Sequence, residues 1–174
     1  MSAPQGVLTF MATIPCLIAG GVLVKIDPQL EPNELEHRLV YAVSGIIPRL
    51  QFELPVWDSV WMVEQDPTQQ LDALLEIFCA GETLTFDHRF KPLTHLGEGI
   101  WELKTPDLRL FGWFCAKDVF IVACIDTATK VKTYNLYAGW AGEAVRQREQ
   151  LDLDEPKFVA GENPEDVVSN YAFP

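Results

Sequence analysis

Five cations in one largely apolar segment have the clearest potential for chemistry: Lys91, Lys104, Arg109, Lys130 and Lys132. Lys104 and Arg109 flank the short connection Thr105-Pro106-Asp107, and the last two lysines stand on either side of Val131. If the chain around Val131 is extended, both of those lysines face one way. Together the five side chains could stabilise a phosphoryl transition state without a metal ion. The alternative is that they are edge-strand charges that prevent aggregation.

A polar loop before this segment adds titratable groups. It carries His88 and His95 together with Arg89 and Lys91. Histidine titrates near neutral pH, so a general base for RNA cleavage could lie in this loop. The simpler interpretation is that both histidines are ordinary polar loop residues.

Three short apolar runs must position these groups. They are joined by polar turns at Thr105-Pro106-Asp107 and Ala116-Lys117. This pattern predicts three adjacent antiparallel strands between Ile100 and Ile125. The runs are apolar on both faces, which indicates central strands covered by helices. Trp101 and Phe111 are therefore predicted to lie in the hydrophobic core.

A helix is predicted on each side of these runs in the chain. The first opens at Asp66-Pro67, has apolar residues at helical spacing and stops at Gly81. The second runs from about Asn135 to Leu151. Its Leu136 and Trp140 lie on the apolar side.

The N-terminal third of the chain is predicted to hold strands and one helix. Asn33 is a good helix N-cap, with Glu36 completing a capping box and Pro48 ending the helix. The predicted extended pieces are Val7–Ile14, Val22–Ile26, Leu50–Val56 and Ser59–Val63. The apolar start of the chain is interrupted by Pro15, Gly20 and Gly21, which favours sheet over a membrane anchor.

The expected organisation is an N-terminal extension over residues 1–60, a main domain over 61–151 and an acidic tail over 152–174. The tail is ordered only if it packs on the body. The net charge is −12 and the pI is near 4.5. A chain this acidic repels nucleic acid at long range. However, 7 of the 13 lysines and arginines lie between residues 82 and 133, so a local cationic face is compatible with the sequence.

The four cysteines indicate a cytoplasmic protein with reduced thiols. None belongs to a CxxC pair, and no Cys/His spacing fits a zinc site. No phosphate loop, nucleophile elbow or dinucleotide fingerprint occurs. The sequence therefore predicts neither a metal nor a cofactor.

Several short motifs follow one another in a characteristic order. They are Lys91-Pro92-Leu93, the run Gly-Glu-Gly-Ile-Trp-Glu-Leu-Lys at 97–104, Leu108-Arg109-Leu110-Phe111, Thr129-Lys130-Val131-Lys132-Thr133 and Glu143-Ala144-Val145-Arg146. In this order the segment from Leu71 to Leu151, about half the chain, resembles the RelE/ParE toxin superfamily. It is most similar to the HigB-like, phage-derived branch.

The resemblance implies an α+β fold, a small, mostly antiparallel twisted sheet packed by helices. It implies a toxin that binds the ribosome, cuts mRNA without a metal and is neutralised by an antitoxin protein. Arg109 would neutralise the scissile phosphate, and Lys130 or Lys132 would stabilise the leaving oxygen or orient the 2′-hydroxyl. Tyr134 would stack on a base or share a proton. The supporting residues would be Lys104, Lys91, Arg89 and His88.

Two other functions remain open on the sequence. One is a non-catalytic protein-interaction module on the same fold, with the acidic ends serving a partner or shielding the cations. The other is a phage structural or accessory protein whose strands pair in an oligomer. Convergence of the five cations on one concave face would favour the enzyme, and scatter would favour the interaction module.

Overall fold

The three apolar runs form the centre of a six-stranded sheet. A computed structural model describes residues 13–61 and 63–174. In it β5 (Trp101–Lys104), β6 (Leu108–Ala116) and β7 (Val119–Thr127) pair antiparallel, as predicted. The sheet order is β1-β2-β7-β6-β5-β4. It is mostly antiparallel, since only the β2–β7 pair of this sheet is parallel.

The outer strands come from the chain on either side of the α2 helix. β4 (Phe90–Pro92) pairs with β5 at one edge. At the other edge β2 (Leu39–Val43) lies against β7, and β1 (Leu23–Lys25) lies against β2. A β-bulge lies between Phe111 and Gly112. The Ile121 backbone approaches Gly112 so closely that a Cβ atom there would clash with the Ile121 carbonyl oxygen.

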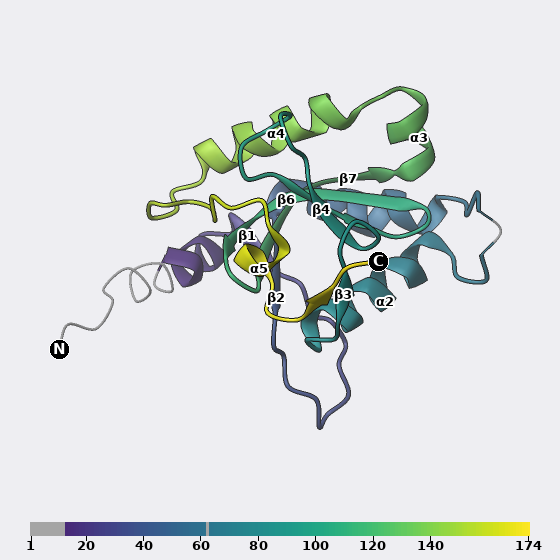
Figure 1. Cartoon of the computed structure of the whole chain (residues 1–174), viewed down its shortest axis with the longest axis horizontal. Helices are drawn as coiled ribbons and strands as arrows, with labels where there is room; N and C mark the ends of the chain where they lie inside the picture. The colour runs from purple at the N-terminus through teal and green to yellow at the C-terminus, as the bar shows by residue number, and fades with distance from the viewer. Residues whose placement is uncertain (1–12, 62) are drawn as a thin grey trace.

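The two faces of the sheet are covered by different helices. Figure 1 shows α4 (Tyr137–Gln150) on one side and α2 (Pro67–Cys79) on the other. Helix α2 begins with a capping box between Asp66 and Gln69 and buries its apolar face, as its sequence pattern predicts. The central strands are sealed between these layers, so Trp101 and Phe111 are fully buried, which confirms their prediction as core residues.

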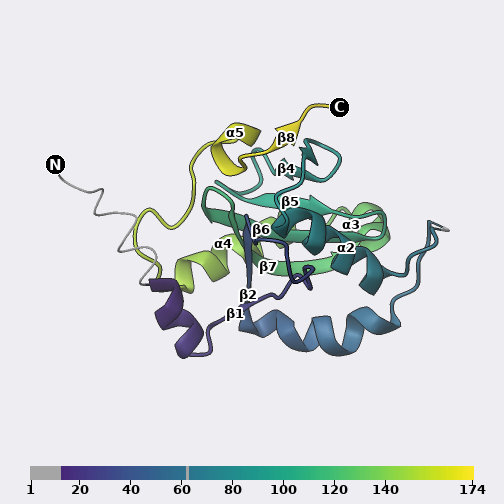
Figure 2. The same ribbon diagram turned by 90° about the horizontal axis from the view of Figure 1, so that it is seen from below.

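Two predictions for the N-terminal third are wrong. The predicted helix from Asn33 to Pro48 does not form over most of its length: a loop leads into β2, and the short 3-10 helix η1 (Ser44–Ile46) follows it. Partners on both sides, β1 and β7, outweigh the helical spacing of the apolar residues here. The predicted extended piece Leu50–Val56 is instead helical, formed by η2 (Arg49–Glu53) and η3 (Leu54–Val56), and Figure 2 shows it as a continuous helical segment.

Other local predictions near the N-terminus had mixed outcomes. Most of the predicted strand Val7–Ile14 lies outside the described residues, and residues 13–19 are helical. The predicted strand Val22–Ile26 is present as β1. Residues 59–61 and 63 form no strand. Among the described residues, no helix has the length and apolar character needed to cross a membrane.

The segment around Val131 is helical, so the condition under which Lys130 and Lys132 would face one way, an extended chain, is not met. α3 (Ala128–Thr133) is capped by Thr127, whose side chain accepts a hydrogen bond from the Lys130 amide. A threonine at this position is a strong N-cap, which explains the helix. The two lysines are thus set on a short helix directly after β7, and the predicted long helix follows as α4.

The acidic C-terminal segment packs on the body. α5 (Pro164–Val167) precedes β8 (Tyr171–Ala172), which pairs parallel with β3 (Leu84–Thr85). Val167 and Val168 are fully buried. The buried Arg38 guanidinium donates to the carbonyl oxygens of Phe78, Glu82 and Asn170, so it ties the end of α2 to the C-terminal segment.

Candidate functional site

A buried carboxylate surrounded by cations lies where β4, β5 and β6 meet. Strand register pairs Lys91 with Glu102 and Lys104 with Arg109, so these four side chains share one face of the sheet. Lys91 Nζ lies 3.7 Å from Glu102 Oε1, and Arg109 Nε lies 3.8 Å from Glu102 Oε2. Asp87 Oδ1 approaches the Nζ atoms of Lys91 at 3.9 Å and Lys104 at 4.0 Å.

The Arg109 guanidinium is held rigidly. Its Nη1 donates to the carbonyl oxygens of Thr105 and Leu108, both at 2.7 Å, and the residue is 7% exposed. Its Nε and both carboxylate oxygens of Glu102 are buried without a hydrogen-bond partner among the described residues. Buried polar groups normally have partners. This group of atoms is therefore preorganised and has unused hydrogen-bonding capacity.

The electrostatics of the cluster reflect its burial. Desolvation raises the pKa of Glu102, although Arg109, Lys91 and Lys104 act in the opposite direction. Desolvation also lowers the pKa of Lys104, against the attraction of Glu102. Three cations face two carboxylates, one buried and one at the rim, so the cluster retains a positive balance.

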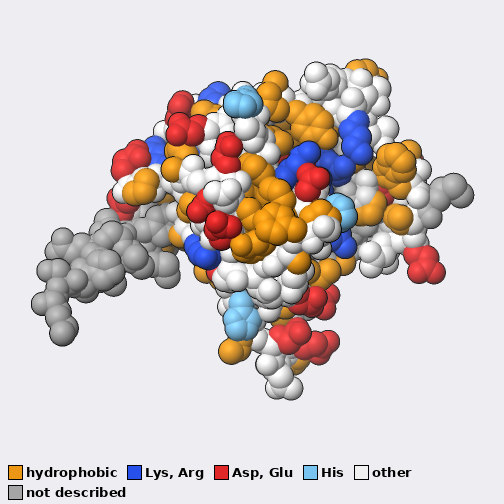
Figure 3. Space-filling view, in the orientation of Figure 1, with side chains coloured by type: hydrophobic (Ala, Val, Ile, Leu, Met, Phe, Trp, Pro, Cys, Tyr) orange, Lys and Arg blue, Asp and Glu red, His pale blue; other side chains and the backbone are white. Residues whose placement is uncertain are grey.

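The cluster opens into a pocket of about 560 Å³. Its walls are Thr85, Asp87, His88, Arg89, Lys104, Thr105, Pro106 and Arg109. His88 is exposed at the rim, and the turn that carries it pairs with the end of β5, because the Lys104 amide donates to the Arg89 carbonyl. In Figure 3, lysine and arginine side chains gather in a stripe near the centre of the visible face, with hydrophobic side chains beside it.

The structure brings some of the sequence-predicted site residues together and places others apart. His88, Arg89, Lys104 and Arg109 line the pocket, and Lys91 flanks it through Glu102. Lys130 pairs instead with Asp126 at 3.6 Å, and the Lys132 Nζ lies 5.5 Å from the Trp61 ring centre. Tyr134 is 69% exposed and lies outside the pocket lining.

Sequence reasoning missed Glu102, the central residue of the cluster. The signal was its position two residues before Lys104 in a predicted strand, which places both on one face. It was a carboxylate inside an otherwise apolar run, and such a residue is rarely buried without charged partners. Asp87 and Thr85 join the site only through the turn between β3 and β4.

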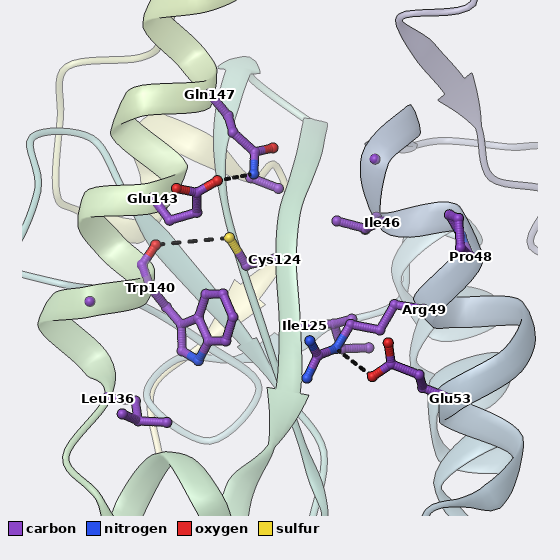
Figure 4. Close-up of a pocket in the computed structure, with 13 residues that line it drawn as sticks. Ile46, Pro48, Arg49, Glu53, Cys124, Ile125, Leu136, Trp140, Glu143 and Gln147 are labelled. Atoms are coloured by element: carbon purple, nitrogen blue, oxygen red, sulfur yellow. Dashed lines mark hydrogen bonds and ion pairs between the residues drawn. The ribbon is translucent and has the colours of Figure 1, made fainter.

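A second hollow, of about 530 Å³, lies between η2 and α4 above β7. Figure 4 shows Arg49 and Glu53 on one wall, Trp140 and Glu143 on the other, and Cys124 between them. Arg49 is already engaged by Glu53 at 3.5 Å and by Asp126 at 3.3 Å. Burial raises the pKa of the Cys124 thiol to about 12, so this cysteine is not an activated nucleophile.

Comparison of the chain with protein-family models, with curated proteins and with solved structures gives no match.

Proposed function

We propose that the protein is a RelE/HigB-like, metal-independent ribonuclease that holds the scissile phosphate of mRNA in the pocket beside Glu102. The observation that carries the proposal is the fixed Arg109 guanidinium next to Lys104 in a pocket that also contains Arg89 and His88. Preorganised cations are the main means of stabilising a phosphoryl transition state when no metal takes part.

The proposed reaction assigns a role to each group. His88 takes the proton of the ribose 2′-hydroxyl, and the 2′-oxygen attacks phosphorus. Arg109 and Arg89 balance the charge of the phosphoryl oxygens. The bond from phosphorus to the 5′-oxygen breaks, and Lys104 donates a proton to that oxygen. The lowered pKa of Lys104 suits this donor role. The products are a 2′,3′-cyclic phosphate and a 5′-hydroxyl.

The proposal includes the setting in which such toxins act. The substrate is mRNA on the ribosome in the cytoplasm, and the regulatory partner is an antitoxin protein. Lys130, Lys132 and Tyr134 are left out of the reaction, because they lie outside the pocket lining.

Cleavage of single-stranded RNA by purified protein tests the proposal. Lys104→Ala and Arg109→Lys are expected to lower the cleavage rate by about 100-fold or more, as loss of a charge-stabilising donor does. Lys132→Ala is the matched control and is expected to cleave like the wild type. The proposal would be overturned if all three variants lost cleavage activity equally, or if the wild type neither bound nor cleaved RNA.

A non-catalytic protein-interaction module is the second candidate. It is favoured by the ion pairs, since Lys91, Lys104 and Arg109 each already lie within 4.0 Å of a carboxylate. In that case neither the wild type nor any variant binds RNA, and inducible expression leaves growth and mRNA intact.

A further inference from the structure

The C-terminal segment places the half-buried Tyr171 and the exposed Phe173 next to the turn that carries part of the pocket lining. The parallel pairing of β8 with β3 aligns Thr85 with Ala172, and the Phe86 amide donates to the Ala172 carbonyl at 2.8 Å. The ring centre of Phe173 then lies 5.7 Å from that of Phe86. Figure 2 shows β8 and the C-terminus next to β4.

One turn connects this aromatic group to the pocket. Phe86 lies between Thr85 and Asp87, which both line the pocket, and His88 follows directly. The aromatic group consists of Phe86, Tyr171 and Phe173. The ring centres of Tyr171 and Phe173 are also 5.7 Å apart. The backbone of this turn therefore links the aromatic group to the lining of the pocket.

The aromatic group packs on the hydrophobic core on one side, and Phe173 is its exposed member. Phe86 makes an edge contact with buried Phe90, which stacks on Trp101 at 5.8 Å. Phe173 is 65% exposed, although the β3–β8 pairing holds the strand directly before it. An aromatic ring that is held in place while much of its surface faces solvent loses little entropy when a planar ligand stacks on it.

We propose that Phe173, backed by Phe86 and Tyr171, is a base-stacking platform for single-stranded RNA whose phosphate occupies the pocket. The inference rests on the proposed function and names the form of its substrate. Aromatic side chains next to cations are the usual means of binding single strands, because the rings stack on bases while the cations follow the backbone. A duplex would not offer its bases to Phe173 in this way.

The platform predicts how affinity depends on the base. A short single-stranded RNA and the same strand with one abasic site are titrated against the wild type, Phe173→Ala and Phe173→Trp. Loss of the ring is expected to weaken binding of the intact strand roughly 5- to 100-fold. Phe173→Trp is expected to retain the affinity. When the abasic site falls at the position whose base stacks on Phe173, it should weaken RNA binding by the wild type. The same abasic site should not change RNA binding by Phe173→Ala.

Phe52→Ala is the matched control, because Phe52 is 73% exposed on η2 and contributes to neither the pocket nor the platform. Lys104→Ala is expected to reduce the slope of log affinity against log salt, whereas Phe173→Ala leaves that slope unchanged. Thermal unfolding confirms that each variant is folded.

The outcomes separate the two proposals. If Lys104→Ala weakens binding while Phe173→Ala binds both strands like the wild type, the platform is wrong and the phosphate pocket stands. If Phe173→Ala and Phe52→Ala weaken binding equally, the platform is likewise overturned. If the wild type binds no RNA, both proposals fail. The aromatic group would then be interpreted as a contact surface for an apolar segment of a partner protein.

Discussion

Glu102 sets the charge of the candidate site. Its carboxylate is fully buried among Lys91, Lys104 and Arg109, and desolvation raises its pKa. When it is ionised, it offsets part of the positive charge offered to a phosphate. When it is protonated, its negative charge no longer offsets the charge of these cations. The protonation state of Glu102 is therefore expected to tune the affinity of the pocket for anions.

Replacing Glu102 with Gln is therefore expected to strengthen RNA binding at pH 8. Because burial raises the pKa of Glu102, its carboxyl should take up a proton at a higher pH than an exposed glutamate does, and the advantage of the variant should shrink as the pH is lowered. Fluorescence titration of labelled RNA at several pH values measures the ratio of the RNA affinity of Glu102→Gln to that of the wild type. Glu98→Gln, at an exposed site in the loop before β5, serves as the control. A ratio that stays constant with pH would show that Glu102 does not titrate in the folded protein.

Asp107 anchors the turn that forms one wall of the pocket. Its carboxylate accepts hydrogen bonds from Ser59 Oγ at 2.6 Å, the Val60 amide at 3.0 Å and Gln70 Nε2 at 2.6 Å. Burial alone would raise its pKa, but these hydrogen bonds outweigh burial, so the pKa is lowered. The loop after η3 and helix α2 are thus both tied to the turn between β5 and β6.

Asp107→Asn is expected to destabilise the protein at pH 7 by about 1–3 kcal/mol. The pKa of Asp107 is lowered in the folded state from about 3.9 in the unfolded chain. Its stabilisation is thus complete above that value and is lost as the pH falls through the folded-state pKa. Thermal unfolding should show that the stabilities of the wild type and Asp107→Asn converge as the pH falls below about 4. Asp58→Asn, at an exposed position in the same loop, should have little effect at either pH.

At the scale of elements, Arg38 links parts of the chain that are distant in sequence. It stands just before β2, and its guanidinium reaches the last turn of α2, Glu82 and Asn170. It also pairs with Asp118 at 3.3 Å. Arg38 therefore helps to hold the segment just before β8, together with the β3–β8 pairing.

Arg38→Met is expected to lower the free energy of unfolding by roughly 3–5 kcal/mol, the usual cost of breaking a buried charged network. The effect should be largest in the C-terminal segment. Hydrogen exchange should show faster exchange of the Leu84 and Phe86 amides, which pair with Asn170 and Ala172. Arg146→Met, at an exposed pair with Glu143, is the control and should leave exchange unchanged. Uniform acceleration across the sheet would contradict a local role.

At the scale of the whole molecule, a strongly negative net charge coexists with a locally cationic cluster around Glu102. The net charge is −12. The sequence left open whether the acidic ends shield the cations, and made order in residues 152–174 depend on packing against the body. Val167 and Val168 are core residues and β8 completes a sheet, so deletion of the segment would unfold part of the body.

Substitution tests the shielding more cleanly than deletion. Combined Asp152→Asn, Glu155→Gln and Glu162→Gln substitutions at exposed positions are expected to strengthen RNA binding at low salt. The gain should fade near physiological ionic strength, where the Debye length is about 8 Å. The charge-preserving set Asp152→Glu, Glu155→Asp and Glu162→Asp should bind like the wild type in filter-binding titrations. A gain that persists at high salt would indicate a structural cause.

The sequence by itself determined the elements with strong local signals. The three central strands follow from apolar runs with short polar turns, and α2 follows from its Asp66 cap and helical spacing. These patterns act within a few residues, so neighbouring sequence is enough to specify them. The gathering of Lys104 with Arg109 was also foreseeable, because both flank one tight turn.

Only the tertiary structure decided the features that depend on distant partners. Residues 39–43 are a strand because β7, about 80 positions later, offers a pairing edge. Register decided that Glu102 meets Lys91 and Arg109, whereas the Thr127 cap carried Lys130 and Lys132 onto a helix outside the pocket lining. The aromatic group at the C-terminus exists because β8 pairs with β3. Local periodicity specifies which face a residue takes, but burial and pairing across the chain determine what that face meets.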